Sequence, residues 1–218
     1  MRTRGLLIVG MAAIAASLLL GVGGMASGWV GGSSISLPGG MMGSGFNGGG
    51  RDIGMDRAVD IAQGVAASYP TGGLVADEVI EFSNNYYASM REKSTGTGAF
   101  EILIDRSSGT VMREPGPDMM WNAKYSMMRS GMMGSFGFSG SGAMTVTAQQ
   151  AQDIAQRWLD ANRSGTSANP PDPFYGYYTV DFQRKGQIVG MLSVNGNSGQ
   201  VWYHTWHGSF IAMRDLGA

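Results

Sequence analysis

The 218-residue sequence contains no cysteine and only two histidines, His204 and His207. The absence of cysteine excludes disulfide bonds and thiolate metal sites, and it removes the thiol as a nucleophile. No Gly-x-Ser-x-Gly elbow is present either. We therefore expect no catalytic activity. An enzyme would need a pocket that holds one of the two histidines beside a carboxylate or a hydroxyl group.

Charge is also scarce, at 14% of the residues. Of the 15 basic residues, Arg2 and Arg4 precede Arg51, so the body carries 13 (15 − 2) against 16 acidic residues. Binding of nucleic acid relies on clustered Lys and Arg against phosphate. A weakly acidic body with no basic run therefore excludes nucleic acid as a partner.

The first 30 residues have the layout of an export signal. Two arginines are followed by a long uncharged segment, and small residues near Ala26 offer a cleavage site. If residues 5–30 are not cleaved, they are long enough to anchor the chain in a membrane of about 30 Å hydrocarbon thickness. Both outcomes predict an exported protein, periplasmic or extracellular, with the second tethering it to the cytoplasmic membrane.

Glycine, with 36 residues, is concentrated in two stretches. Residues 31–50 are rich in Gly, Ser and Met, which predicts a tether. Residues 115–143 form a Met- and Gly-rich bridge between two segments with a different pattern. We predict these segments, 51–114 and 144–218, to be folded units.

Each predicted unit begins with a helix and continues with strands. Apolar residues recur at helical spacing over 55–66 and again over 151–161. Runs typical of strands follow the first helix at 74–82, 86–93, 99–105 and 110–113, and the second at 175–184, 187–194 and 200–205. The fold class expected is α+β, with two tandem helix-plus-antiparallel-sheet units joined by the bridge.

Three short matches relate the two units. Asp60-Ile-Ala-Gln63 recurs as Asp153-Ile-Ala-Gln156, and Tyr86-Tyr87 recurs as Tyr177-Tyr178. The strand–turn–strand segment 104–111 recurs at 194–201 with Ser-Gly at the same place. Three matches in one order indicate an internal duplication.

At these residues the chain resembles the PepSY superfamily, whose members carry a helix followed by an antiparallel sheet of three or four strands. Residues 102–111 are similar to the family's closing Asp-x-x-Ser/Thr-Gly-x-Val hairpin, and residues 192–201 to a second copy. Relatives in the superfamily are peptidase propeptides and periplasmic or membrane-attached accessory domains. The resemblance implies a non-catalytic binding or accessory module that recognises an extracytoplasmic peptide or protein.

A sheet covered by a helix on one face leaves its other face open to a partner. Tyrosine and tryptophan are the residue types that anchor interfaces. The candidate partner-binding residues are therefore the aromatic residues of the strands and the bridge: Tyr86, Tyr87, Trp121, Tyr177, Tyr178, Trp202 and Trp206.

The methionines and histidines support a different function, the binding of Cu(I). Thioether sulfur is a soft ligand suited to this ion, and imidazole also binds copper. The candidate ligands are three Met-Met pairs and the two histidines: Met119, Met120, Met127, Met128, Met132, Met133, His204 and His207. Two explanations without a metal stay open, namely that the methionines fill gaps in packing and that the histidines cover a sheet face. No other cofactor is expected.

Overall fold

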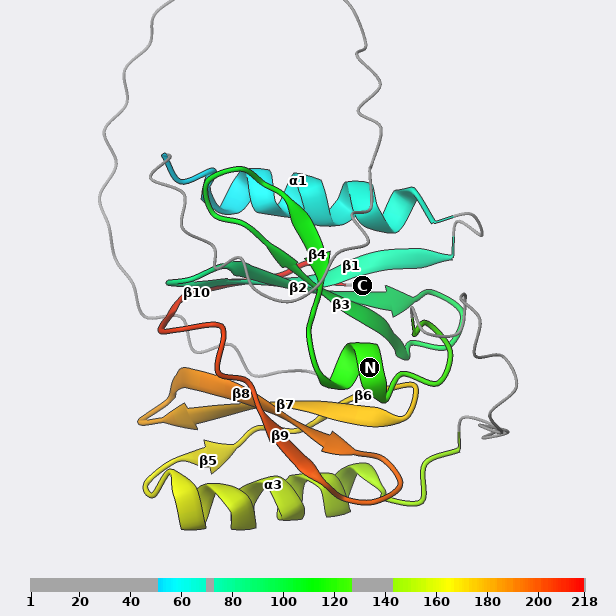
Figure 1. The fold of residues 1–218 in the computed structure, drawn as a ribbon, viewed down its shortest axis with the longest axis vertical. Coiled ribbons are helices and arrows are strands. Elements are labelled where there is room, and N and C mark those ends of the chain that lie inside the picture. The colour runs from blue at the N-terminus through cyan, green and yellow to red at the C-terminus, as the bar shows by residue number, and fades with distance from the viewer. Residues whose placement is uncertain (1–50, 70–72, 127–142, 218) are drawn as a thin grey trace, which may run out of the picture. The chain divides into compact units, whose positions relative to one another are not determined.

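The computed structural model describes residues 51–69, 73–126 and 143–217. Helix and strand positions agree closely with the sequence pattern in the first part of the chain (Figure 1). The elements there are α1 (Gly54–Ala67), β1 (Leu74–Phe82), β2 (Tyr86–Glu92), β3 (Gly98–Ile104), β4 (Val111–Arg113) and the one-turn helix α2 (Pro117–Met120).

The second part also contains the expected helix and three expected strands, and it adds three short strands that the sequence pattern did not predict. Its elements are α3 (Ala148–Asn162), β5 (Ser167–Ala168), β6 (Asp172–Phe174), β7 (Tyr177–Arg184), β8 (Gln187–Asn195), β9 (Val201–Tyr203) and β10 (Phe210–Asp215). The α+β class is confirmed.

The strands of the described residues form one mixed sheet of ten, in the order β10-β1-β2-β3-β6-β7-β8-β9, with β4 on β3 and β5 on β7. The expectation of two antiparallel sheets is therefore wrong, because β10 pairs with β1 and β6 pairs with β3, so that the strands of both parts belong to one sheet. A single parallel pairing, Gly98 with Phe174, joins β3 to β6. A Cβ atom at Gly98 would lie 2.5 Å from the Phe174 ring, so glycine is what allows this close junction.

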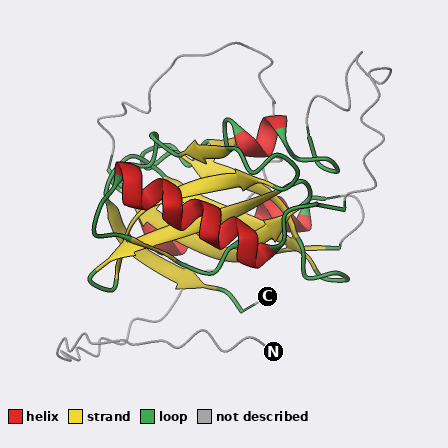
Figure 2. Cartoon of the chain, turned by 90° about the horizontal axis from the view of Figure 1, so that it is seen from below, coloured by secondary structure: helices red, strands yellow, loops and turns green. Residues whose placement is uncertain are grey.

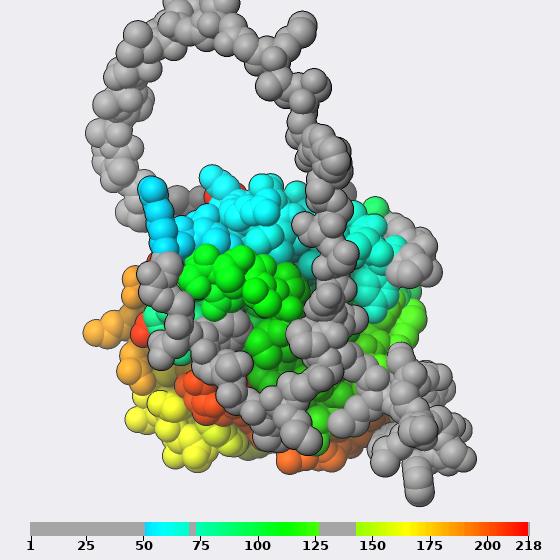
Figure 3. Space-filling view, turned by 45° about the horizontal axis from the view of Figure 1, so that its top comes forward, coloured from blue at the N-terminus to red at the C-terminus, as the bar shows by residue number. Residues whose placement is uncertain are grey.

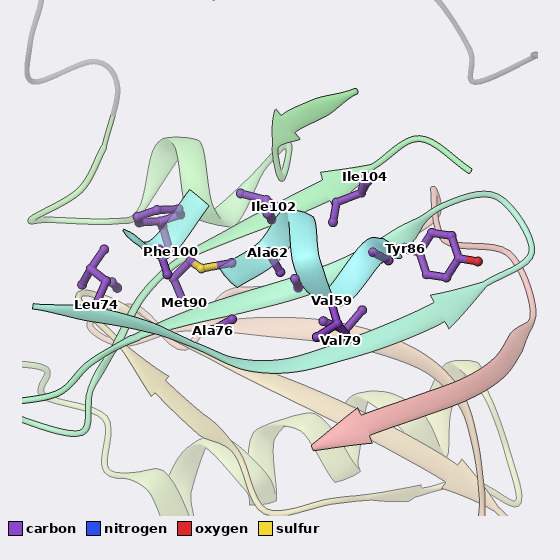
Figure 4. Close-up of a cluster of buried hydrophobic side chains, with 14 residues drawn as sticks. Val59, Ala62, Leu74, Ala76, Val79, Tyr86, Met90, Phe100, Ile102 and Ile104 are labelled. Atoms are coloured by element: carbon purple, nitrogen blue, oxygen red, sulfur yellow. The ribbon is translucent and has the colours of Figure 1, made fainter. Parts of the chain in front are cut away.

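Helix α1 covers one face of β1–β3 (Figure 1), whereas the helix in the foreground of Figure 2, which is seen from below, is α3 on the opposite side of the fold. Its buried face carries Ala58, Val59 and Ala62, and small residues there let the helix approach the sheet closely. The strands supply larger apolar side chains, as Figure 4 shows: Leu74, Val79, Tyr86, Met90, Phe100, Ile102 and Ile104. In the space-filling view the green segment around β4 adjoins the cyan surface of α1 (Figure 3).

Helix α3 covers one face of β7 and β8 in the same way. It begins at a capping box, in which the Thr147 hydroxyl accepts from the Gln150 amide and the Gln150 side chain accepts from the Thr147 amide. Ala151, Ala155 and Leu159 are its buried residues. They pack on strand residues of the same cluster: Tyr178, Val180, Phe182, Leu192 and Val194.

The strand faces turned away from the helices are not open to water, which corrects the expectation of an exposed aromatic face. Ile80, Phe82, Tyr87, Leu103 and Met191 form a buried cluster on these faces, here called the interlayer core. The cluster joins β1, β2 and β3 to β8 of the second part. All four candidate tyrosines are buried: Tyr86, Tyr87, Tyr177 and Tyr178. A tyrosine gains most from burial when its hydroxyl finds a partner, and each of these hydroxyls does.

The same helix–hairpin contact occurs twice in the fold. Gly109 (φ 72°) and Gly199 (φ 69°) each end a turn in the left-handed region. A Cβ atom at these positions would lie 2.9 Å and 3.1 Å from the Cδ1 atoms of Ile61 and Ile154, respectively. Both isoleucines belong to the matched Asp-Ile-Ala-Gln segments, so the sequence match corresponds to a shared packing arrangement.

The sequence match aligns Tyr86 with Tyr177, but strand pairing in the structure shifts this alignment by one residue. Tyr86 pairs with Ile104, and Tyr178 pairs with Val194. Since Ile104 and Val194 are equivalent in the repeat, Tyr86 corresponds to Tyr178. The two hydroxyls also act alike, because each bonds to the segment just before its helix, at Asp52 and at the Val146 carbonyl.

The described part of the bridge, residues 115–126, contacts both parts of the fold. Glu92 of β2 accepts hydrogen bonds from Lys124 and Tyr125 of the bridge and from Tyr175 before β7, the last at 2.6 Å. The Ala123 amide donates to the Tyr175 carbonyl at 2.8 Å. This arrangement fits a bridge that crosses from one part to the other.

The expected leader (1–30), the tether (31–50) and the methionines at 127, 128, 132 and 133 lie outside the described residues. Among the helices that are described, none combines the length and the apolar character needed to span a bilayer. The domain boundaries stay a prediction.

Candidate functional site

The two histidines meet a buried carboxylate. His207 Nε2 lies 3.0 Å and His204 Nδ1 lies 3.3 Å from the same oxygen of Glu114, Oε1. The two ring nitrogens are 3.4 Å apart. These three residues, here called the acid–histidine cluster, are at most 3% exposed. They form the one group of three or more His, Asp or Glu side chains with converging ligand atoms that was found among the described residues.

The end of β9 explains how both histidines reach one place. Residues at i and i+3 of a regular strand point to opposite faces, so a strand that continued through Trp206 would separate them. Strand β9 ends at Tyr203, and His204 and His207 lie in the turn that follows. This turn leads the chain back from the α3 side to β10 beside β1 (Figure 1). Glu114 comes directly after β4 and has no spacing to the histidines that a sequence pattern could reveal.

The outer nitrogen of each imidazole is held by a polar side chain. Asn85 Nδ2 donates to the Trp206 carbonyl at 3.0 Å, which orients the amide so that Asn85 Oδ1 faces His207 Nδ1, also at 3.0 Å. An amide oxygen only accepts, so Nδ1 of His207 carries its hydrogen. His204 Nε2 lies 2.9 Å from Ser193 Oγ.

Aromatic rings fix the planes of the imidazoles. Phe82 stacks on His207 at 4.5 Å between ring centroids, and Trp206 stacks on His204 at 4.7 Å. The Trp206 indole also donates to Glu114 Oε1 at 3.1 Å. The cluster is therefore rigidly built before any ligand arrives.

Electrostatics keep Glu114 charged. Burial opposes the charged form of this carboxyl group, but the facing His204 and His207, when they carry the extra proton, outweigh burial and hold its pKa well below the ordinary value of 4.5. Burial lowers the pKa of His207 below 6.5, against the attraction of Glu114. The carboxylate thus remains an anion in a site that water does not reach.

A second buried acid, Glu101 of β3, lies close by. Its Oε1 atom accepts hydrogen bonds from Tyr87 at 2.6 Å and Thr179 at 2.7 Å, and its Oε2 atom accepts from Tyr177 at 2.8 Å. Burial first, and then the charges of Glu114 and Asp118, raise the pKa of Glu101 well above 4.5. Glu101 thus binds β7 to β3 across the fold.

A chain of polar side chains connects the two acids. Thr179 donates to Glu101, its hydroxyl lies 3.4 Å from Ser193 Oγ, and Ser193 bonds to His204. The sequence reasoning missed Glu101, Glu114, Asn85 and Ser193. They come from four separate segments, and only the folded chain brings them together.

One arrangement resembles the catalytic triad of a hydrolase. The Ser193 hydroxyl contacts the His204 imidazole, and the imidazole in turn faces the Glu114 carboxylate. A nucleophile must be reached by its substrate. Ser193 is 0% exposed, and its hydroxyl lies between Thr179 and His204. A surface hollow of about 300 Å³ beside α3 is lined by neither histidine nor Ser193. The arrangement therefore favours a structural or ligand-holding role over nucleophilic catalysis.

The two candidate methionine ligands that lie among the described residues do not share the burial of the histidines. Met120 is 58% exposed and Met119 is partly buried. Cu(I) prefers sulfur and imidazole to a carboxylate oxygen, and a carboxylate is what the two histidines face. Cu(I) binding by the methionines stays a prediction.

Two of the candidate partner-binding residues do meet at the surface. Trp121, which follows α2, and Trp202 of β9 contact each other edge to face, with ring centroids 5.9 Å apart. Both are partly exposed, and exposed Met120 precedes Trp121. These three residues are called the Trp surface below. Trp206 is partly exposed, but its indole N–H donates to Glu114 of the acid–histidine cluster.

No protein-family model matches the sequence, and no curated protein does. Among solved structures, the C-terminal domain of Bacillus megaterium YpeB matches with 12% identity and a TM-score of 0.26. The match covers 70% of this chain and 62% of that one. Similarity at this level carries no argument about function, so the function has to be argued from the residues.

Proposed function

We propose that the protein is a non-catalytic binding module that works outside the cytoplasm and recognises a peptide or a partner protein through the Trp surface. The single observation that carries this proposal is the contact between Trp121 and Trp202 at the protein surface, beside exposed Met120. The resemblance to the PepSY superfamily supports it, since two tandem PepSY-like units would form such an accessory module. The export pattern of residues 1–30 supports the location.

The Trp surface is held in place by its surroundings. Gly116 has φ 82°, and a Cβ atom there would lie 3.0 Å from the Trp202 ring, so the backbone before α2 passes directly over this indole. The Met120 amide donates to the Gly116 carbonyl, and the Trp121 amide donates to the Pro117 carbonyl at 2.7 Å. A partner would therefore meet two indoles that are already oriented.

Tryptophan and methionine are suited to such a contact. Tryptophan is enriched among the residues that dominate binding energy, because it buries a large area with few rotatable bonds. Methionine adapts its flexible side chain to irregular surfaces. A short extended or helical peptide with one or two apolar anchors is the class of ligand that fits this surface.

The test is selection of peptides from a displayed random library on the immobilised full chain. Selected peptides should lose at least tenfold in affinity when Trp121 or Trp202 is changed to alanine. Trp158→Ala is the matched control. This partly exposed tryptophan belongs to α3 and not to the Trp surface, and it stacks on Tyr203 with ring centroids 5.6 Å apart. If no selected peptide depends on Trp121 or Trp202, the proposal fails.

A further inference from the structure

The acid–histidine cluster carries a second inference, independent of the Trp surface. Three ligand atoms, Glu114 Oε1, His204 Nδ1 and His207 Nε2, lie 3.0, 3.3 and 3.4 Å from one another. Zn²⁺ binds histidine nitrogen and carboxylate oxygen at roughly 2.0–2.2 Å in tetrahedral sites, which places neighbouring ligand atoms about 3.3 Å apart. The triangle already has the dimensions of such a site.

The hydrogen bonds around the cluster leave lone pairs directed at its centre. His207 carries its hydrogen on Nδ1 because Asn85 Oδ1 accepts there, so Nε2 of the neutral ring presents a lone pair to Glu114. Ser193 lies at the outer nitrogen of His204 and can accept its hydrogen, which frees Nδ1 in the same way. Outer partners of this kind orient the histidine ligands of metal sites.

Three acceptor atoms at these distances repel one another unless a cation lies among them. The site is buried, so water does not screen the carboxylate. The second oxygen, Glu114 Oε2, is buried and has no hydrogen-bond partner within the described ranges 51–69, 73–126 and 143–217. Such an orphaned acceptor is unusual, and it offers a fourth ligand atom from the same residue.

We propose that Glu114, His204 and His207 bind one divalent transition-metal ion of the Zn²⁺ class. Two imidazoles and a carboxylate suit this borderline metal, whereas Cu(I) would favour sulfur. The ion would join the segment after β4 to the segment between β9 and β10. It would thereby fasten the C-terminal strand to the first part of the fold. Burial implies that the ion enters during folding or through local opening.

The experiment uses the full chain, unfolded in chelator and refolded with or without Zn²⁺. One equivalent of Zn²⁺ should remain after gel filtration, and the Zn²⁺-refolded protein should melt at a higher temperature than the metal-free protein. Glu114→Gln keeps the shape of the side chain and removes its charge, and it should lose both effects. Glu101→Gln is the matched control, since it neutralises an equally buried glutamate whose oxygens face hydroxyl groups, and it should retain both.

A second measurement does not depend on the variants folding. The unmodified chain refolded with Co²⁺ should show the visible absorption of a four-coordinate cobalt site, and Zn²⁺ should abolish it. Absence of this absorption together with no retained Zn²⁺ overturns the proposal. A proton on one of the two histidines would then supply the positive charge beside Glu114. Retention of Zn²⁺ by Glu114→Gln at the level of the unmodified chain also overturns it, because the ion then binds elsewhere.

Discussion

Tyr177 of β7 donates a 2.8 Å hydrogen bond to the buried carboxyl group of Glu101 in β3. The two residues belong to different parts of the fold, and among the described residues strand pairing between these parts is limited to Gly98 with Phe174 on one side and β10 with β1 on the other. Side-chain hydrogen bonds therefore contribute substantially to joining the parts.

Tyr177→Phe should lower the free energy of unfolding by about 1–3 kcal/mol, because it removes a buried donor and leaves a glutamate oxygen unsatisfied. Urea denaturation followed by circular dichroism measures this. Tyr178→Phe, which removes a bond to one backbone carbonyl in a partly buried place, should cost less. Equal costs for the two variants would contradict the role given to Tyr177.

Replacing Glu101 itself separates hydrogen bonding from charge. Glu101→Gln should be tolerated because burial raises the pKa of Glu101 and so disfavours the charged form that glutamine lacks, and glutamine keeps an acceptor for Tyr87 and Thr179. Glu101→Ala should destabilise the protein by roughly 3 kcal/mol or more, since three buried hydroxyl groups lose a bond to Glu101 and, of the three, Tyr177 also donates to Asp118. A glutamine variant as unstable as the alanine variant would show that the charged form is needed.

Asp105 should give the protein part of its stability against acid. Burial opposes ionisation of this residue, but hydrogen bonds from Ser107 and Ser108 outweigh burial and lower its pKa from 3.8 to about 2. A lowered carboxyl pKa stabilises the folded state fully at pH values above 3.8, and this contribution is lost as the pH falls through about 2. Asp105→Asn copies Asn195, which makes the equivalent turn bonds to the amides of residues 197 and 198. Unfolding curves from pH 5 to 2 should show a shallower loss of stability for this variant, and parallel losses would refute the assignment.

Replacement by alanine should change the stability of the folded protein in opposite directions at two glycines. Gly64 is an exposed residue inside α1 with no atom within 4 Å of an added Cβ, so Gly64→Ala should raise stability by about 0.5–1 kcal/mol. Gly109→Ala should lower it by about 1 kcal/mol or more, because φ is 72° and Ile61 lies 2.9 Å away. Thermal melts of both variants measure the difference, and destabilisation by Gly64→Ala would contradict the packing of α1.

Ser193 should not react as a nucleophile, although it precedes His204 and Glu114 in a triad-like order. Incubation of the folded protein with a fluorophosphonate probe should leave it unlabelled, as mass spectrometry of the digested protein would show. A subtilisin-type protease serves as the positive control for the probe. Labelling of Ser193, abolished by Ser193→Ala, would establish a reachable nucleophile and overturn the non-catalytic function.

The local pattern of the sequence was enough to predict much of the fold. The apolar spacing over 55–66 predicted α1 and that over 151–161 predicted α3, whose start the structure places at a Thr147–Gln150 cap that depends on neighbours in the chain alone. The Ser-Gly turns predicted two hairpins because a glycine at positive φ is a local requirement.

Long-range features could not be predicted in this way. Alternation along β2 and β7 shows that a strand has two faces, but it does not show that the second face meets another layer, so buried Tyr87 and Tyr177 were expected at the surface. Glu114 and His204 meet only because the chain turns back after β9. That turn depends on the pairing of β10 with β1, and β10 was not recognised from the sequence.

The return of β10 to β1 also sets an order of events during synthesis. Strand β1 begins at Leu74, yet the neighbour that covers one of its edges ends at Asp215. A chain that emerges from its N-terminus therefore displays an unpaired strand edge, a template for aggregation, until β10 has emerged. Contacts this distant in sequence form slowly. A chaperone or an export machinery that keeps the chain unfolded until release would protect it during this interval.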